Sequence, residues 1–221
     1  QETTKVRRSD RLKRTKSINT TGLKIEKILT NTKLGFQTYT DQLNSDENGM
    51  TINSFPKASG QLTSLYIDYS LHGENFRLTP GIKYDGYNLS SRDFTSKSAS
   101  EMSRKLDYTY SFTEKLKTNL IYSEGFNAPR VDEVYPSGIH SNGDNFVIRD
   151  NFFITNPDLK HETSAMKELE LSYETNLFSL EDNFKFGVSY FENDVKDYIS
   201  MERIDRSIFE ENNGTTQFIN I

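Results

Sequence analysis

The chain has 221 residues, which allows one or two ordinary domains, and it carries a formal net charge of −5 with a pI near 5.4. This acidic balance gives no reason to expect a nucleic-acid partner. The lack of cysteine excludes a disulfide framework and thiolate metal sites. The mean hydropathy of −0.73 is low for a chain that must bury its own core. No run of ~18 apolar residues is present that could form a transmembrane helix.

Aromatic residues are frequent, with 12 Tyr and 15 Phe, and this composition suits strands rather than helices. No comparable stretch has helical spacing, and together with the terminal QFINI the alternation predicts about nine strands. In chain order, alternating apolar and polar residues predict strands at Thr21–Ile25, Leu34–Thr38, Leu65–Leu71, Phe76–Tyr84, Leu106–Phe112, Leu116–Tyr122, Leu169–Tyr173 and Phe184–Tyr190.

The connections between these strands alternate in length. Short turns are expected near Leu29–Thr32, His72–Asn75, Thr113–Lys115 and Leu180–Asn183. Long polar loops are expected near Thr40–Gln61, Leu89–Ser103, Arg130–His161 and Asp205–Thr215. Short and long connections therefore lie at opposite ends of the strands, as in outer-membrane barrels, which have short periplasmic turns and long outer loops.

The two faces of the strands differ in the way that a barrel requires. The polar faces carry charged residues such as Arg77, Lys83 and Asp107, and the apolar faces are rich in Tyr and Phe toward the strand ends. We therefore predict an all-β fold, namely an antiparallel transmembrane β-barrel of which this chain forms part. Because QFINI breaks off within a strand pattern, residues 1–221 are expected to be an arc of a larger barrel. Alternation alone also fits a β-sandwich, in which one face of each strand is buried and the other is wet.

The most informative stretch runs from Asn119 to Thr163. It opens with NLIYSEGFNAP (Asn119–Pro129), a strand pattern that ends in a proline, and closes with NPDLKHET (Asn156–Thr163), a turn signature before another strand. The polar segment 130–155 between them carries His140. A long loop between two strands is a common place for binding residues in a β-protein.

These motifs resemble the C-terminal half of TonB-dependent outer-membrane receptors of the haem and haemoglobin branch. SEGFNAPRVDEVY (Ser123–Tyr135) is similar to the FRAP box of that branch, with Asn127 where Arg is usual. NPDLKHET is similar to its NPNL box, with His161 where Pro is usual. FRLTPGIKYDGYNL (Phe76–Leu89) and SYFENDVKDYIS (Ser189–Ser200) also look typical, and the resemblance extends from about Asn19 onward.

The resemblance implies a receptor in the outer membrane of a Gram-negative bacterium, in contact with its lipid. It would bind haem, or haemoglobin or a similar host carrier, and import haem with energy from the TonB–ExbB–ExbD complex. Haem would be the transported ligand and not a permanently bound cofactor. The plug domain, which meets TonB, and the final strands would lie outside residues 1–221. A ferric-siderophore receptor stays open as an alternative, and so does a surface β-sandwich adhesin from a different class.

His140 matches the histidine that the haem branch keeps on this outer loop, so the resemblance implies a haem-iron ligand here. Neutral imidazole is a good axial ligand. His161 is a weaker haem-binding candidate, because it stands at a loop-to-strand junction in place of a proline and a role in the turn is the better explanation. The residues of the two boxes are expected to shape the base of the loop, although contact with haem stays open. These residues are Phe126, Asn127, Ala128 and Pro129 in the first box, and Asn156, Pro157, Asp158 and Leu159 in the second.

Four aromatic residues of the same loop, Tyr135, Phe146, Phe152 and Phe153, could stack on a porphyrin or hold a carrier protein, or could pack the loop onto itself. Nothing in the sequence indicates an enzyme. It has no phosphate-binding glycine loop, no histidine cluster with metal-ligand spacing, and no nucleophile, histidine and acid in a catalytic pattern.

Overall fold

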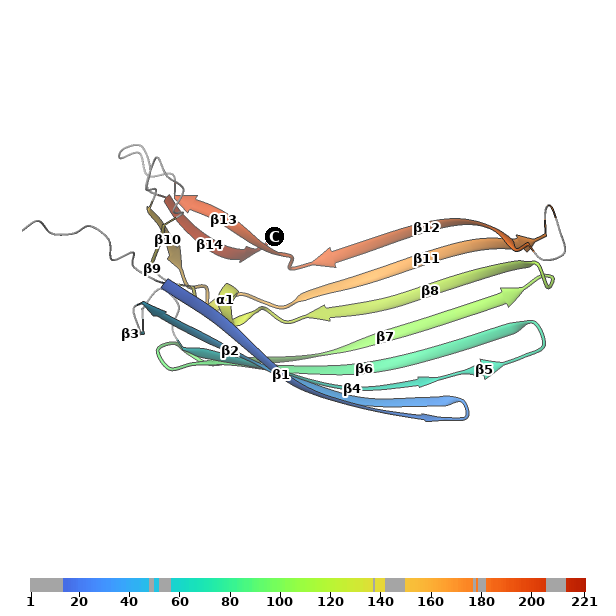
Figure 1. Ribbon diagram of the computed structural model, residues 1–221, viewed down its shortest axis with the longest axis horizontal. Coiled ribbons are helices and arrows are strands. Elements are labelled where there is room, and N and C mark those ends of the chain that lie inside the picture. The colour runs from blue at the N-terminus through green and yellow to red at the C-terminus, as the bar shows by residue number, and fades with distance from the viewer. Residues whose placement is uncertain are drawn as a thin grey trace, which may run out of the picture.

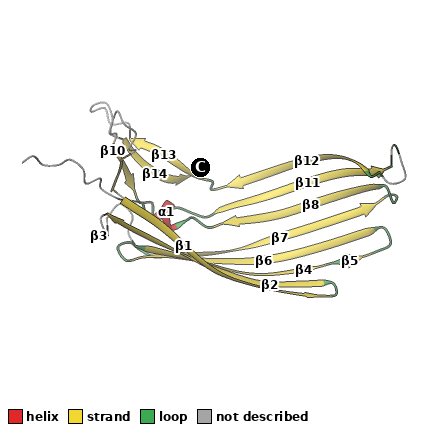
Figure 2. Cartoon of the chain, viewed as in Figure 1, coloured by secondary structure: helices red, strands yellow, loops and turns green. Residues whose placement is uncertain are grey.

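A computed structural model describes residues 14–47, 50–51, 57–136, 138–141, 150–176, 178, 182–205 and 214–221 (Figure 1). Nearly all of the described chain is β-strand (Figure 2). The elements are β1 (Arg14–Leu29), β2 (Thr32–Glu47), β3 (Met50–Thr51), β4 (Ala58–Tyr69), β5 (Leu71–His72), β6 (Phe76–Ser91), β7 (Lys97–Ser111), β8 (Leu116–Asn127), α1 (Val131–Val134), β9 (Gly138–Ser141), β10 (Asp150–Ile154), β11 (Glu162–Thr175), β12 (Phe184–Lys196), β13 (Ile199–Asp205) and β14 (Gly214–Asn220). In the described part of the chain, no helix is long and apolar enough to span a membrane.

The long strands form one antiparallel sheet in the order β1-β2-β4-β6-β7-β8-β11-β12, with β3 paired to β2 and β5 paired to β6. Each long strand thus lies beside its neighbours in sequence, as in an up-and-down meander. The eight expected alternating segments all lie in this sheet. The ninth, QFINI, lies in and just after β14, which belongs to a second sheet with the order β13-β14-β10-β9.

One face of the main sheet is apolar and exposed, and we call it the apolar face. Its side chains alternate along the strands as the sequence predicts. They include Leu65, Ile67, Tyr69, Ile82, Tyr84, Leu106, Leu120, Leu169, Leu171, Tyr173, Phe186, Val188 and Tyr190, all exposed. A soluble sandwich would cover such a face with a second sheet. No described segment covers this one, so it is of the kind that meets lipid.

Aromatic side chains of this face gather at the end of the sheet with the short turns. The Phe76 and Tyr108 rings lie 6.3 Å apart, Tyr108 and Tyr110 6.4 Å, and Tyr110 and Phe112 5.0 Å. Phe184 and Phe186 meet edge to face at 4.5 Å. Such a belt is typical of the membrane interface.

The opposite face, which we call the polar face, carries ion pairs, one within β6 and two that join different strands. Lys83 lies 2.9 Å from Asp85, Lys105 lies 3.9 Å from Asp68, and Lys185 lies 3.4 Å from Glu174. The predicted division into a charged face and an apolar face is therefore confirmed.

The predicted bounds of two long loops are wrong. β2 continues to Glu47 and β4 begins at Ala58, and β6 continues to Ser91 before β7 begins at Lys97, so much of 40–61 and 89–103 is strand. The reason is that the hydrogen-bonded ladder continues where the apolar alternation stops. A strand of 16 residues such as β6 is about 53 Å long at ~3.3 Å per residue, whereas the apolar band of a barrel is only ~25 Å tall.

The segment 130–155 is also more structured than the polar loop predicted from the sequence. It contains the one-turn helix α1 and the strands β9 and β10. β10 pairs with β9 in antiparallel fashion and with β14 in parallel. The four-stranded sheet lies beyond α1, at the end of the molecule opposite to the short turns (Figure 1).

Candidate functional site

The helix α1 anchors the loop between the two sequence boxes to the wall of the sheet. Val131 and Val134 of α1 and the following Tyr135 are buried. They belong to one apolar cluster with Leu43, Ala58, Tyr87, Leu89 and Leu159. These wall residues continue the polar face, which becomes apolar at its outer end. The signal in the sequence is VDEVY, in which apolar residues recur at the i, i+3 and i+4 spacing of a helix.

The N-terminus of α1 is held by its own charged residues. The backbone N–H of Arg130 donates to Glu133 Oε2 at 2.8 Å, which satisfies a donor before the first turn. The Arg130 guanidinium forms a two-pronged pair with Asp132, with Nε 3.0 Å from Oδ1 and Nη2 3.1 Å from Oδ2. Burial raises the pKa of the Glu133 carboxyl.

The first box forms the end of β8 and the entry to α1. Pro129 is buried, and Phe126 is half-buried with its ring 5.8 Å from Tyr87. The Asn127 side chain donates to Glu162 Oε2 at 2.5 Å, across the ladder to β11. Asn127, at the position where the resemblance places Arg, is thus bonded to a carboxylate of the wall.

The second box closes the same structure from the other side. The Asn156 N–H donates to the carbonyl of Val134 at 3.2 Å, and its side chain donates to the carbonyl of Phe218 at 2.8 Å. Asn156 Oδ1 accepts from the Asp158 N–H at 3.1 Å, which makes an Asx turn. Leu159 is fully buried in the α1 cluster. Both boxes therefore support one packed unit at the base of the loop.

A lysine of β7 joins the second box to the wall. Lys97 Nζ donates to the carbonyl of Pro157 at 2.9 Å, and burial lowers the pKa of this ammonium. The contact spans 60 residues of sequence. It gives the outer end of β7 a direct role in fixing the loop.

His161 lies where the second box enters β11. Its Nε2 is 3.4 Å from Glu101 Oε2 on β7, and its ring centroid is 4.9 Å from that of Phe126 and 6.1 Å from that of Tyr87. Three strands thus supply the surroundings of this imidazole. Glu101 and Tyr87 could not be predicted as neighbours of His161, because strand register rather than sequence spacing brings them together.

His140 lies in β9, at the edge of the four-stranded sheet, where its backbone pairs with Asn151 of β10. Phe152 pairs with Ile139 in the same ladder, and the Phe153 ring lies 6.3 Å from Phe218. Phe146 lies outside the described residues.

Tyr135 packs the loop onto the rest of the chain, which is one of the two roles that the sequence left open for it. It is completely buried, its ring stacks on Phe94 at 5.8 Å, and its hydroxyl donates to the carbonyl of Thr95 at 3.0 Å. Burial raises the pKa of this phenol.

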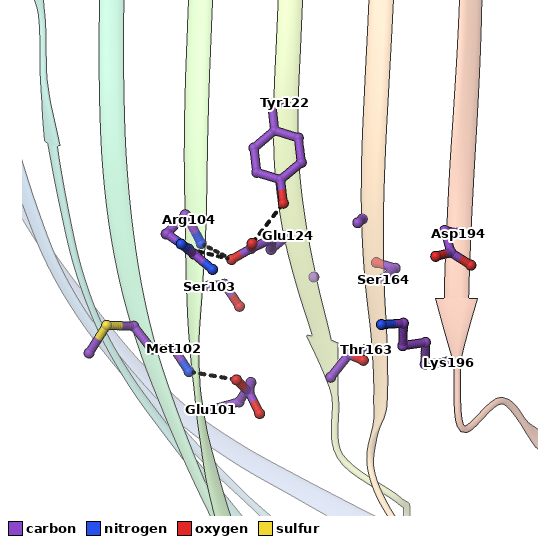
Figure 3. A pocket seen from close by; sticks show the side chains of 12 residues that line it. Glu101, Met102, Ser103, Arg104, Tyr122, Glu124, Thr163, Ser164, Asp194 and Lys196 are labelled. Carbon is purple, nitrogen blue, oxygen red and sulfur yellow. Dashed lines mark hydrogen bonds and ion pairs between the residues drawn. The ribbon is translucent and has the colours of Figure 1, made fainter.

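A hollow of about 310 Å³ lies below this region, where β7 and β8 separate (Figure 3). The β7–β8 ladder ends at the pair Lys105 and Ser123, whereas β8 stays paired to β11 as far as Asn127. Beyond Lys105, Glu124 Oε2 accepts from the Arg104 N–H at 2.8 Å and from its Nε at 3.2 Å, in place of a ladder bond.

The hollow has a mixed charge. Glu124 is bonded to Arg104 on one side of it, near Glu101, and Asp194 and Lys196 of β12 lie on the other side (Figure 3). No group of three or more possible metal-ligating side chains occurs among the residues that the structure describes. The arrangement supports neither a metal centre nor a strong anion site.

Comparison with protein families gives one match that covers almost the whole chain. The family described as "TonB dependent receptor-like, beta-barrel" matches residues 3–221.

Curated relatives are receptors and utilisation proteins named for haem. The "Heme/hemopexin utilization protein C" of Haemophilus influenzae (strain 86-028NP) is 35% identical over 153 residues, which are 67% of this chain and 21% of the relative. The "Hemin receptor" of Yersinia pestis is 29% identical over 183 residues, which are 78% of this chain and 25% of the relative. The chain therefore spans about a fifth to a quarter of the length of these relatives.

Solved structures share the fold. The Serratia marcescens hemophore receptor HasR, in complex with its hemophore HasA and heme, aligns with a TM-score of 0.65 and 17% identity, over 94% of this chain and 36% of that one. The siderophore receptor PirA from Pseudomonas aeruginosa aligns with a TM-score of 0.55 and 16% identity, over 94% of this chain and 45% of that one. At these identities the likeness concerns the fold alone, and both kinds of receptor share it.

Proposed function

Because the chain belongs to the TonB-dependent receptor-like β-barrel family, a family of outer-membrane receptors and not of enzymes, we propose that it forms part of a haem receptor. The receptor binds haem or a haem-carrying protein at its outer loops and imports haem with TonB-derived energy. The names of the curated relatives favour haem over a ferric siderophore. The observation that carries the proposal is the packed unit of the two boxes, which is bonded through Asn156 to β14 of the sheet that includes the His140 strand.

The two faces of the main sheet have separate roles in this receptor. The apolar face, with its aromatic belt, meets the lipid of the outer membrane. The polar face lines the lumen, where ion pairs such as Lys83 with Asp85 keep the wall hydrophilic. The short turns then lie on the periplasmic side and the four-stranded sheet lies outside the cell.

His140 supplies an axial ligand to haem iron, as the resemblance implies. Its place on an edge strand of the outer sheet, in the described part of the chain, favours access for a ligand from outside. Phe146 and Phe152 of the same loop contact the porphyrin or its carrier. The two boxes act through shape: Asn127 is bonded to Glu162 across the ladder, and Asn156 is bonded to the carbonyl of Phe218 and the N–H of Asp158. Haem is cargo, not a resident cofactor.

The partners follow from the family. A haem-carrying host protein such as haemoglobin docks on the outer loops, and the TonB–ExbB–ExbD complex acts through a plug domain. Residues 1–221 belong to the barrel, and the plug and the final strands lie elsewhere in the receptor. The much greater length of the curated relatives supports this division.

The test uses the complete receptor in a host strain that lacks its own haem uptake. His140→Ala is expected to abolish growth on haemoglobin as the iron source. His72→Ala is the matched control, because His72 lies in β5 next to a short turn at the other end of the molecule. Unimpaired growth of the His140→Ala strain on haemoglobin would contradict the proposed ligand. Growth of the parent on a ferric siderophore but not on haem would favour the siderophore alternative.

A further inference from the structure

A polar hollow of about 390 Å³ lies on the same side of the main sheet as the apolar face, and we call it the rim hollow. It spans β4, β6 and β7, which lie side by side (Figure 1). Strand register arranges its lining in two rows, Thr63, Gly86 and Ser100 in one and Gln61, Asn88 and Ser98 in the next. The row before them contains the pair Leu65 and Tyr84 of the apolar face. Alternation along each strand therefore places the rim hollow just beyond the apolar band.

The lining of the rim hollow is polar but carries no charge among the residues that the structure describes. The side chains of Gln61, Asn88, Ser98 and Ser100 form no hydrogen bond with another residue in the described part of the chain. Their amide and hydroxyl groups can therefore both donate to a ligand and accept from it. Such uncharged groups suit the hydroxyls of a sugar, whereas a phosphate would favour lysine or arginine.

Gly86 leaves the centre of the rim hollow open. A Cβ at this position would have Cε1 and Oη of Tyr84 as its nearest neighbours, at 3.7 and 3.8 Å, so packing within the chain does not exclude a side chain here. The Tyr84 ring bounds the hollow on the side of the apolar band and is 45% exposed. A ring with an apolar surface and a polar hydroxyl suits a ligand that changes from apolar to hydroxylated at this level.

Tyr84 also lines a second hollow, an apolar groove of about 550 Å³ in the apolar face. The groove runs over β1, β2, β4 and β6, and its lining includes Ile25, Leu65 and Ile82. Lys27 adds one charge to this lining, close to the short turn between β1 and β2. Because Tyr84 belongs to both hollows, an acyl chain in the groove brings its headgroup to the rim hollow. The two hollows together fit a lipid whose headgroup carries hydroxyls.

We propose that the rim hollow and the apolar groove bind one glycolipid from the leaflet nearer to α1. Its uncharged sugar lies over Gly86, and its acyl chain follows the groove. Gln61 and Asn88 form hydrogen bonds with the sugar hydroxyls, and Tyr84 contacts the junction of sugar and chain. The site faces away from the lumen, so it does not depend on which cargo the receptor imports.

The experiment uses the complete receptor, folded into vesicles of phosphatidylcholine and monoglucosyl diacylglycerol in equal amounts and with the same acyl chains. The receptor is extracted into detergent, and native mass spectrometry measures each lipid that it retains. Because the two lipids differ only in the headgroup, contacts of the chains alone predict equal retention. We expect the parent receptor to retain the glucolipid about 10-fold more than the phosphocholine lipid, the effect of one or two hydrogen bonds.

Gly86→Val fills the rim hollow and should remove this preference. It is expected to fold like the parent, because a Cβ fits there and a β-branched residue suits a strand. Asn88→Leu removes one amide at similar size, should lower the preference severalfold, and replaces the valine variant if that variant does not fold. Gly187→Val is the matched control, because a Cβ there also has its nearest atom at 3.7 Å but lies on the polar face. It should keep the preference of the parent.

Equal retention of the two lipids by the parent would overturn the inference. So would a Gly86→Val receptor that folds, as judged by gel mobility, and keeps the full preference. Methyl glucoside, added at the concentration of the glucolipid, should leave the lipid bound, because it lacks a chain for the groove. Complete displacement would assign the rim hollow to a soluble saccharide and overturn the lipid as occupant. Haem titration of the same receptor tests the proposed function separately.

Discussion

Tyr66 of β4 reaches across β2 to Glu26 of β1, and Gly35 of β2 makes this possible. The three residues are directly opposite one another in the β1-β2-β4 ladder. The Tyr66 hydroxyl donates to Glu26 Oε2 at 2.5 Å, and its ring lies over the position where Gly35 has no side chain. Lys24 and Lys33 lie 3.2 and 3.3 Å from the same carboxylate. A single aromatic side chain thus ties three strands together on the polar face.

A methyl group at Gly35 should break this connection. Its Cβ would overlap Cζ of Tyr66, so the ring would have to leave Glu26. We expect Gly35→Ala to destabilise the barrel by about 1–3 kcal/mol, the usual cost of overpacking. The measurement is the unfolding of the receptor in detergent, followed by its shift in gel mobility on heating.

Gly187→Ala is the matched control for this change. It lies on the same face in β12, and the nearest atom to a Cβ there is Glu170 Oε1 at 3.7 Å. The two variants should therefore differ clearly in stability. Equal unfolding temperatures of the two variants would show that the contact between Tyr66 and Glu26 does not stabilise the barrel.

Leu159 should matter more for the loop than for the barrel. It is fully buried in the α1 cluster, and Leu159→Ala should cost that unit about 2–5 kcal/mol through the cavity left behind. We expect faster amide hydrogen exchange in 131–135 and 156–159 and weaker haem binding, with the main sheet unaffected. Leu171→Ala, at an exposed site of the apolar face, should leave the exchange of these segments unchanged.

The raised pKa of Glu133 predicts a pH dependence of α1. Burial disfavours the ionised form in the folded loop, so the folded-state pKa of Glu133 lies above the ordinary value of a glutamate. The loop therefore gains stability as the pH falls through the folded-state pKa, and the gain is complete below the unfolded value. Hydrogen exchange in 131–135, corrected for the intrinsic effect of pH, should be slower in mild acid than at neutral pH.

Glu133→Gln can still accept the hydrogen bond from the Arg130 N–H but cannot ionise. Its exchange rates, after the same correction, should not change between neutral pH and mild acid. A variant that keeps the pH dependence of the parent would assign that dependence to another carboxyl group.

A charged side chain on the apolar face should destabilise the barrel in a membrane. Val188 is 75% exposed near the middle of β12, and Val188→Arg should cost about 2–4 kcal/mol if the site lies in the bilayer. Ser189→Arg changes the next residue, which faces the lumen side, and should cost much less. Folding into lipid vesicles, followed by gel mobility, separates the two. Equal tolerance of both changes, or folding without detergent or lipid, would favour the sandwich alternative.

The main sheet was predictable because its information is local. A period of two along β6 or β12 sets which side chains face lipid, and this pattern needs no knowledge of other strands. The outer ends of the strands escaped prediction because backbone pairing persists there without apolar alternation. The sequence predicted the turn between β1 and β2 at residues 30–31, but it did not predict that β2 extends to Glu47.

For the candidate site, too, local features were predictable and contacts between distant strands were not. The two boxes and the hypothesis for His140 come from residues adjacent in sequence, and the role of His140 stays a prediction. The apolar cluster around α1 could not be predicted, because two of its members, Leu43 and Leu89, lie in segments that the sequence predicts as loops but that the structure shows as strands. The pairing of His161 with Glu101 depends on how β7 separates from β8, a property of the ladder and not of either segment.

The sequence by itself determined an antiparallel barrel wall, its lipid-facing side and the loop that carries the receptor motifs, because alternation and turn residues act over a few neighbours. Only the tertiary structure decided which strands bring side chains together. It packed α1 against the polar face, bonded Asn127 and Asn156 of the two boxes to neighbouring strands, and set Tyr87 and Glu101 beside His161. The contacts of His161 with Glu101 and Tyr87 join residues 60 and 74 positions apart, and the pairing of the strands brings them together.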